Sequence, residues 1–92
     1  MAAIDGYEAD PAEVRALIDQ QVDVEDLADP TLLYVRATQL HVLHTAIANE
    51  LAQLRAEAAG RLHADGMSYA RIAAHLGMSR GRAQQLVGKS SP

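Results

Sequence analysis

The chain has 92 residues and a formal net charge of −4, and it contains no Cys, Phe or Trp. This length suffices for one domain with a modest core. The absence of cysteine excludes disulfides, thiolate zinc sites and cysteine nucleophiles. With three Tyr as the only aromatic residues, the core must be built from Leu, Ala, Val, Ile and Met, which favours packed helices. We therefore expect an all-α fold.

The charges are sorted along the chain. Residues 1–35 hold nine acidic residues against Arg15 alone, whereas residues 69–92 hold no acid and four bases, Arg71, Arg80, Arg82 and Lys89. Local potential steers binding to a polyanion more than net charge does, so the C-terminal end is the part suited to DNA. Neither a signal peptide nor a long apolar run is visible, which predicts a cytoplasmic protein without a membrane partner.

Residues 1–28 are predicted to form an acidic N-terminal tail and one short helix. Asp10 is a good N-cap, Pro11 suits the first helical position, and Glu13 lies near the positive helix end. We expect this helix to end near Gln20, and the acidic residues 21–28 have room for another turn. Its apolar stripe consists of Val14, Leu17 and Ile18. A helix this short is not stable alone, so the stripe must dock on something.

Residues 29–65 are predicted to form one long helix, because Asp29 and Pro30 repeat the start signal and no Pro or Gly follows until Gly60. Unbroken, it spans roughly 50 Å at about 1.5 Å per residue. Its apolar residues follow alternating four- and three-residue steps, as in a coiled coil. We expect this seam to pair with a second copy, as a homodimer, through Leu33, Ala37, Leu40, His44, Ile47, Leu51 and Leu54. Gly60 either kinks the helix or allows close packing, and Leu62 faces the C-terminal helices.

Residues 66–88 are predicted to form a helix-turn-helix. Ser68 caps a first helix, whose inward face carries Ile72, Ala73 and Leu76, and Gly77 ends it. Ser79 caps a second helix that buries Ala83 and Leu86. The long helix supplies the first member of this trihelical unit, and residues 89–92 are expected to be a frayed tail.

The outward face of the second helix carries the candidate DNA contacts. Arg80 can donate two hydrogen bonds to guanine, and Gln84 or Gln85 can pair with the N6/N7 edge of adenine. Gly81 would let the backbone approach DNA. The expected phosphate partners are Ser68, Tyr69, Arg71, Ser79 and Lys89, with capping alone as the alternative role of the two serines. The alternative for the whole face is that these are ordinary solvated residues of a helical bundle.

The segment SYARIAAHLGMSRGRAQQL resembles the promoter-reading helix-turn-helix of region 4 in bacterial sigma factors. Residues 79–86 resemble the recognition-helix core of primary sigma factors, Thr/Ser-Arg-Glu-Arg-Ile/Val-Arg-Gln-Ile. The resemblance covers about a quarter of the chain and implies that Arg80, Gly81, Gln84 and Gln85 occupy base-reading positions and that Arg82 lies near the phosphate backbone. Gly81 replaces an acidic reader and Gln84 a basic one, so the family's promoter preference does not carry over. The whole chain resembles small stand-alone bacterial helix-turn-helix proteins.

The sequence predicts no metal, no cofactor and no enzymatic activity. His41 and His44 are three residues apart on one helix, but no third ligand has matching spacing, so we interpret His44 as a polar seam residue. No Ser, Thr or Tyr forms a catalytic constellation with a His and a carboxylate. We expect sequence-specific binding of double-stranded DNA as a homodimer, by a transcription regulator or nucleoid-associated protein. The alternative is an adaptor that docks its acidic N-terminal half on a transcription component or toxin, although that acidity can also serve solubility.

Overall fold

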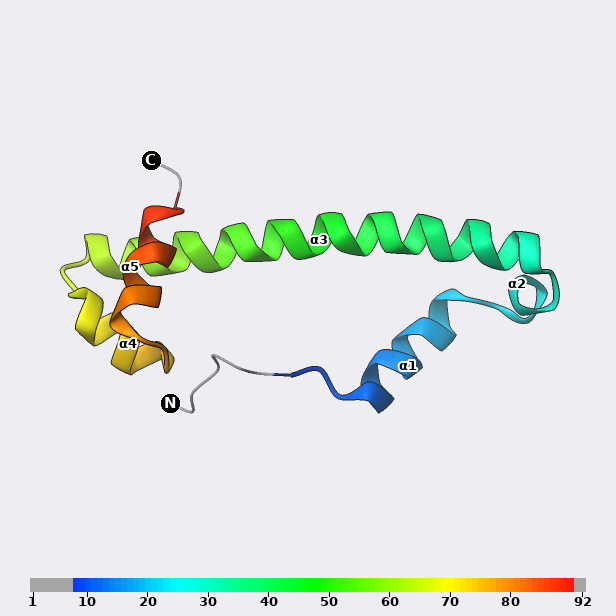
Figure 1. Ribbon diagram of the computed structural model, residues 1–92, viewed down its shortest axis with the longest axis horizontal. Coiled ribbons are helices and arrows are strands. Elements are labelled where there is room, and N and C mark those ends of the chain that lie inside the picture. The colour runs from blue at the N-terminus through cyan, green and yellow to red at the C-terminus, as the bar shows by residue number, and fades with distance from the viewer. Residues whose placement is uncertain (1–7, 91–92) are drawn as a thin grey trace. The chain divides into compact units, whose positions relative to one another are not determined.

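The computed structural model describes residues 8–90, and every regular element in that range is an α-helix (Figure 1). In chain order the helices are α1 (Pro11–Gln21), α2 (Val24–Ala28), α3 (Pro30–Ala64), α4 (Tyr69–Leu76) and α5 (Arg80–Gly88). The predicted all-α class is confirmed, and α2 is the extra turn that residues 21–28 had room for. None of the described helices combines the length and hydropathy needed to cross a lipid bilayer.

The described residues form two compact units, and α3 contributes to both. The first, residues 8–47, holds α1, α2 and the first half of α3. The second, residues 48–90, holds the second half of α3 with α4 and α5. Each unit is described by itself below.

In the first unit, carboxylates cap both short helices. Asp10 Oδ1 accepts a hydrogen bond from the Ala12 amide (3.0 Å) and caps α1. Asp23 and Asp26 form a capping box on α2, in which each side chain accepts the other residue's backbone N–H. The N–H of Asp26 lowers the pKa of Asp23 below its ordinary value of 3.8. This cap therefore stabilises α2 above that pH and is lost as the pH falls through the lowered pKa.

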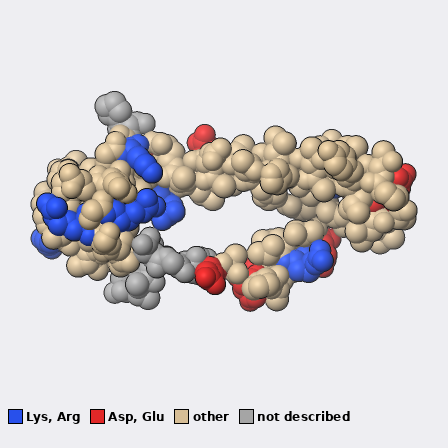
Figure 2. All heavy atoms as spheres, in the orientation of Figure 1, with Lys and Arg blue, Asp and Glu red and all other residues tan. Residues whose placement is uncertain are grey.

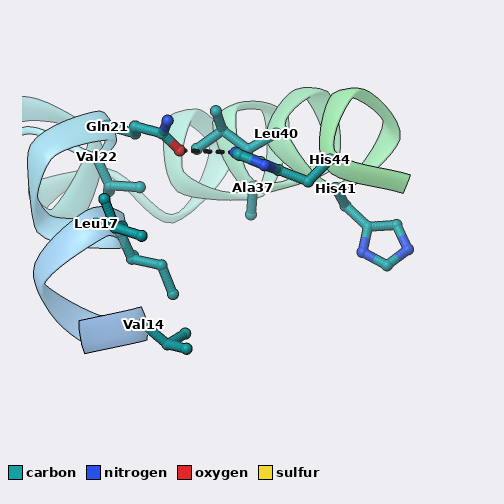
Figure 3. Close-up of a pocket in the computed structure, with 9 residues that line it drawn as sticks. Val14, Leu17, Gln21, Val22, Ala37, Leu40, His41 and His44 are labelled. Atoms are coloured by element: carbon teal, nitrogen blue, oxygen red, sulfur yellow. Dashed lines mark hydrogen bonds between the residues drawn. The ribbon is translucent and has the colours of Figure 1, made fainter. Parts of the chain in front are cut away.

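An open apolar groove of about 420 Å³ lies between α1 and the first half of α3 (Figure 3). Its lining includes the predicted stripe of α1, although Val14, Leu17 and Ile18 remain 42%, 52% and 40% exposed. The groove is lined by Val14, Leu17, Ile18, Gln21, Val22, Ala37, Leu40, His41 and His44. Nε2–H of His44 donates to Oε1 of Gln21 (2.9 Å), so His44 has a partner within its own chain.

The groove changes the interpretation of the seam that the sequence predicts on α3. Ala37, Leu40 and His44 belong to that seam, but they line the groove beside α1. Ile47, Leu51 and Leu54 are exposed. The residues of the predicted seam therefore have two different environments within one copy of the chain: three line the groove and three are exposed.

In the second unit, small side chains make up most of the core. The buried residues are Ala56 and Ala59 of α3, Ile72 and Ala73 of α4, and Ala83 and Leu86 of α5. Leu62 packs against the Ile72–Ala73–Ala83 cluster, as expected for the end of the long helix. Because alanine projects only a methyl group, these helices can approach closely at their contacts.

Gly60 belongs to the same close contact, and α3 continues through it as a helix. A Cβ at Gly60 would lie 2.7 Å from the Cβ of Ser90, closer than two such atoms can approach. Of the two roles considered for this glycine, close packing is therefore the one its surroundings support.

Ser90 is itself held in place. Its hydroxyl and its amide both donate to the Val87 carbonyl, at 2.7 and 3.1 Å. The Lys89 amide donates to the Gln85 carbonyl at 3.2 Å. Hydrogen bonding thus continues past Gly88, the last residue of α5, to Ser90. Residues 91–92 lie outside the described range.

The contact between Gly60 and Ser90 can be tested by a double-mutant cycle. Alanine is favoured over glycine inside a helix by about 1 kcal/mol, so Gly60→Ala should stabilise the protein where space allows. In the natural sequence we expect the clash with Ser90 to cancel or reverse that gain. In a Ser90→Gly background the same substitution should raise the free energy of unfolding in urea. An equal effect of Gly60→Ala in both backgrounds would contradict the contact.

Candidate nucleic-acid interface

The turn between α4 and α5 is set by Gly77 and Ser79. Gly77 has φ of 75°, a left-handed conformation in which a side chain is strained. The amides of Gly77 and Met78 both donate to the Ala73 carbonyl at 2.9 Å, which closes the end of α4. Ser79 Oγ then accepts the Arg82 amide (3.1 Å) and starts α5. Three residues thus reverse the chain from one helix into the next.

The inward side of α5 is fixed by two buried residues. Ala83 packs with Ile72 and Ala73, and Leu86 packs with Ala56 and Ala59 of α3. The opposite side carries the predicted base-reading residues, all of which are exposed: Arg80, Gly81, Gln84 and Gln85. Arg82 is half-buried. The division between inward and outward positions is the one that the sequence predicts.

The two serines of the candidate site both cap helices. Ser68 Oγ accepts the Arg71 amide (3.2 Å) at the start of α4, as Ser79 does at the start of α5. A capping hydroxyl accepts through its oxygen and keeps its own hydrogen to donate. Capping and a phosphate contact are therefore compatible at both positions.

Tyr69 has structural contacts that the sequence did not reveal. Its ring stacks on the His63 ring at a centroid distance of 4.5 Å, and the guanidinium carbon of Arg80 lies 5.9 Å from its ring centroid. Nδ1–H of His63 donates to the Met67 carbonyl (3.0 Å), and this hydrogen bond fixes the His63 ring against Tyr69. Tyr69 also packs against the Ile72–Ala73–Ala83 cluster. The ring of Tyr69 thus joins the core to the first residue of α5.

The basic side chains of this unit have no acidic partners among the described residues. Residues 48–90 hold six Arg or Lys residues and three Asp or Glu residues. Across residues 8–90 the ion pair formed is Arg36 with Asp26 in the other unit (3.5 Å). Figure 2 shows Lys and Arg side chains grouped over the unit that holds α4 and α5. The cations predicted to contact DNA are therefore not paired with any carboxylate of residues 8–90: Arg71, Arg80, Arg82 and Lys89.

The described residues hold no group of three or more His, Cys, Asp or Glu side chains placed to bind a metal. His41 lines the groove beside α1, and His44 is hydrogen-bonded to Gln21. Neither histidine lies in the unit that carries α5.

The sequence predicts which residues α5 exposes, but it does not predict all the residues that α5 packs against. Ala56 and Ala59 were not recognised as core residues, since alanine carries little apolar signal and a search for large apolar steps passes over it. Their three-residue spacing, next to Gly60, was the available signal. The contact of Arg80 with Tyr69 joins two helices and needs coordinates to be seen.

Searches against protein-family models, curated proteins and solved structures found no match to this chain. The likeness of residues 68–86 to sigma region 4 therefore stays a prediction from those residues.

Proposed function

We propose that this protein binds double-stranded DNA as a homodimer, with α5 laid into the major groove as the second helix of a helix-turn-helix. The observation that carries the proposal is the outward face of α5. It presents an arginine and two glutamines, its cations have no acidic partner among residues 8–90, and its inward side is fixed by Ala83 and Leu86.

The chemistry of that face suits base edges. Arg80, at the first turn of α5, has the fork of donors that pairs with O6 and N7 of guanine. Gln84 and Gln85 each carry a donor and an acceptor, which suit N6 and N7 of adenine. Arg82, Arg71 and Lys89 supply charge for phosphate oxygens, as do the amides at the helix starts. The contact with Tyr69 would hold the Arg80 guanidinium partly oriented before DNA arrives.

Two copies would supply the remaining specificity. One recognition helix reads only a few base pairs, so helix-turn-helix proteins commonly pair two of them. The exposed apolar side chains of α3 are the surface for that pairing. A transcription regulator and a nucleoid-associated protein both fit this arrangement.

A second candidate function is an adaptor that binds a basic protein partner. Residues 8–47 hold eight acidic residues and two arginines, one of which is already paired with Asp26. The apolar groove beside α1 lies in this acidic unit. This combination would suit a basic amphipathic segment of a transcription component or toxin.

Removing the two outermost readers of α5 should weaken DNA binding. Each good base contact contributes about 1–3 kcal/mol, so Arg80→Ala with Gln85→Ala should lower affinity for selected sites by about 10-fold or more. Fluorescence anisotropy with duplexes selected from a random pool measures this. The matched control is Arg15→Ala with Gln20→Ala, which removes the same side chains from exposed positions of α1. Equal losses in the two double variants would argue against α5 as the reader.

Binding should also weaken steeply with salt. Three cationic phosphate contacts per copy make six in the dimer, which corresponds to an affinity loss on the order of 1,000-fold between about 50 and 200 mM salt. The measurement uses the unaltered chain and a random-sequence duplex. An affinity that does not change across this range would contradict a phosphate-dependent mode.

Gly81 allows a test that separates fold from binding. A Cβ at Gly81 or at Gly88 meets no atom within 4 Å, so alanine at either position should leave stability unchanged or slightly raised. If the backbone at Gly81 approaches DNA, Gly81→Ala should reduce affinity several-fold while Gly88→Ala leaves it unchanged. Identical affinities of the two variants would remove the proposed role of Gly81.

The adaptor can be tested by neutralising acids that cap no helix. The triple variant Glu8→Gln, Glu13→Gln, Asp19→Asn keeps the caps at Asp10 and Asp23. A DNA-binding protein should bind a random-sequence duplex equally or more tightly after this change, because repulsion of phosphate falls. Absence of DNA binding in both the parent and the triple variant would favour the adaptor.

A further inference from the structure

Side chains from three helices meet at the start of α5. Tyr69 is the first residue of α4, Arg80 is the first residue of α5, and His63 lies in the last turn of α3. The rings of His63 and Tyr69 stack at a centroid distance of 4.5 Å and an angle of 13°. The guanidinium carbon of Arg80 lies over the Tyr69 ring, 5.9 Å from its centroid. We call these three residues the aromatic stack, and all of them belong to the unit of residues 48–90.

The ring of Tyr69 is held by contacts other than the one with Arg80. Tyr69 is half-buried and packs against the Ile72–Ala73–Ala83 cluster. The His63 ring that stacks on it is hydrogen-bonded to the Met67 carbonyl (3.0 Å). The ring is therefore a fixed platform beside an exposed arginine.

An exposed arginine without such a platform loses rotamer freedom when it binds. That loss lowers affinity by about 2- to 10-fold for each long side chain that becomes ordered. A guanidinium over an aromatic ring is attracted through its face and keeps the N–H donors at its edge. No carboxylate of residues 8–90 pairs with Arg80. The contact with Tyr69 therefore orders Arg80 without occupying its donors.

We propose that Tyr69 and His63 are positioning residues of the DNA-reading face, which hold the Arg80 guanidinium ready for the edge of guanine and thereby increase discrimination between base pairs. This inference deepens the proposed function and rests on it. It also gives Tyr69 a different role from the phosphate contact that the sequence predicts, because the stack uses its ring and a phosphate contact uses its hydroxyl.

The two roles of Tyr69 can be separated by two substitutions. Tyr69→Phe removes the hydroxyl and keeps the ring. Tyr69→Leu removes both and keeps an apolar side chain against the core cluster. A phosphate contact strengthens binding to all sequences about equally, whereas orientation of Arg80 strengthens binding only where its guanine is present. Loss of the ring and loss of the hydroxyl should therefore have different effects on discrimination.

The stack is tested first without DNA, by NMR relaxation of the arginine Nε–Hε groups in the full chain. We expect a higher order parameter at Arg80 than at Arg71, an exposed arginine of α4 that has no aromatic contact among residues 8–90. Tyr69→Leu should lower the Arg80 value to that of Arg71, and Tyr69→Phe should leave it unchanged. An Arg80 that is as mobile as Arg71 in the parent chain would overturn the inference.

The contribution of His63 is measured in the same way. His63 is exposed, so His63→Leu removes its ring without opening the core. We expect a lower order parameter at Arg80, because Tyr69 loses the ring that stacks on it. His75→Leu is the matched control, since His75 is an exposed histidine of α4 outside the stack. Equal effects of the two substitutions would overturn the role of His63. If Tyr69→Leu does not fold, His63→Leu carries the test of the stack.

The second test measures discrimination. The guanine that Arg80 reads is the one whose replacement by adenine in a selected duplex weakens binding of the parent chain but not of Arg80→Ala. We expect Tyr69→Leu to lower the ratio of affinities for these two duplexes by about 2- to 5-fold, the size of an exposed cation–π contact. Tyr69→Phe should leave the ratio unchanged. A ratio that is unchanged in Tyr69→Leu, or lowered equally in both variants, would overturn the inference.

Failure of this inference is distinguishable from failure of the proposed function. Discrimination that depends on Arg80 but not on Tyr69 or His63 would remove the positioning role and retain DNA reading by α5. Absence of binding to any duplex would overturn both, even where the relaxation data show an ordered Arg80.

Discussion

Close approach of α5 to α3 and α4 is the constraint on which the candidate interface depends. Ala56, Ala59 and Ala83 are nearly inaccessible to solvent, and they let helix backbones meet where larger side chains would hold them apart. Gly60 extends this contact to Ser90, beyond the end of α5. Because the inward side of α5 is fixed by packing, its outward side is fixed as well. The exposure of Arg80, Gln84 and Gln85 is thus a consequence of which small residues lie beneath them.

The charge of the chain divides where its two units divide. Acidic residues serve the first unit locally, as N-caps at Asp10 and Asp23 and as the partner of Arg36. The second unit caps α4 and α5 with serines instead, and neither helix has an acidic residue in its first turn. A capping carboxylate there would repel phosphate, whereas a serine hydroxyl satisfies the same backbone N–H without charge. The choice of cap thus keeps the helix starts of α4 and α5 suitable for an anion.

Local chemistry explains which features the sequence could predict. Caps at Asp10, Ser68 and Ser79, the glycine stop at Gly77 and the prolines that begin α1 and α3 act within a few residues, so their effects can be read without coordinates. The inward and outward sides of α5 followed from the same local periodicity. The surroundings of each part of α3 did not follow, since one apolar period cannot say that Ala37 and Leu40 line a groove beside α1 while Leu51 stays exposed. The stack of His63, Tyr69 and Arg80 depends on three different helices and was missed for the same reason.

The most direct test of the account is to map the backbone amide shifts of the full chain by NMR while a random-sequence DNA duplex is added at low salt. We expect the largest changes at Arg80 to Gln85 and at the amides that start α4 and α5, with small changes along α1. Changes concentrated in residues 8–47, or an α5 that is unaffected while the duplex binds, would contradict the central claim that the outward face of α5 contacts DNA.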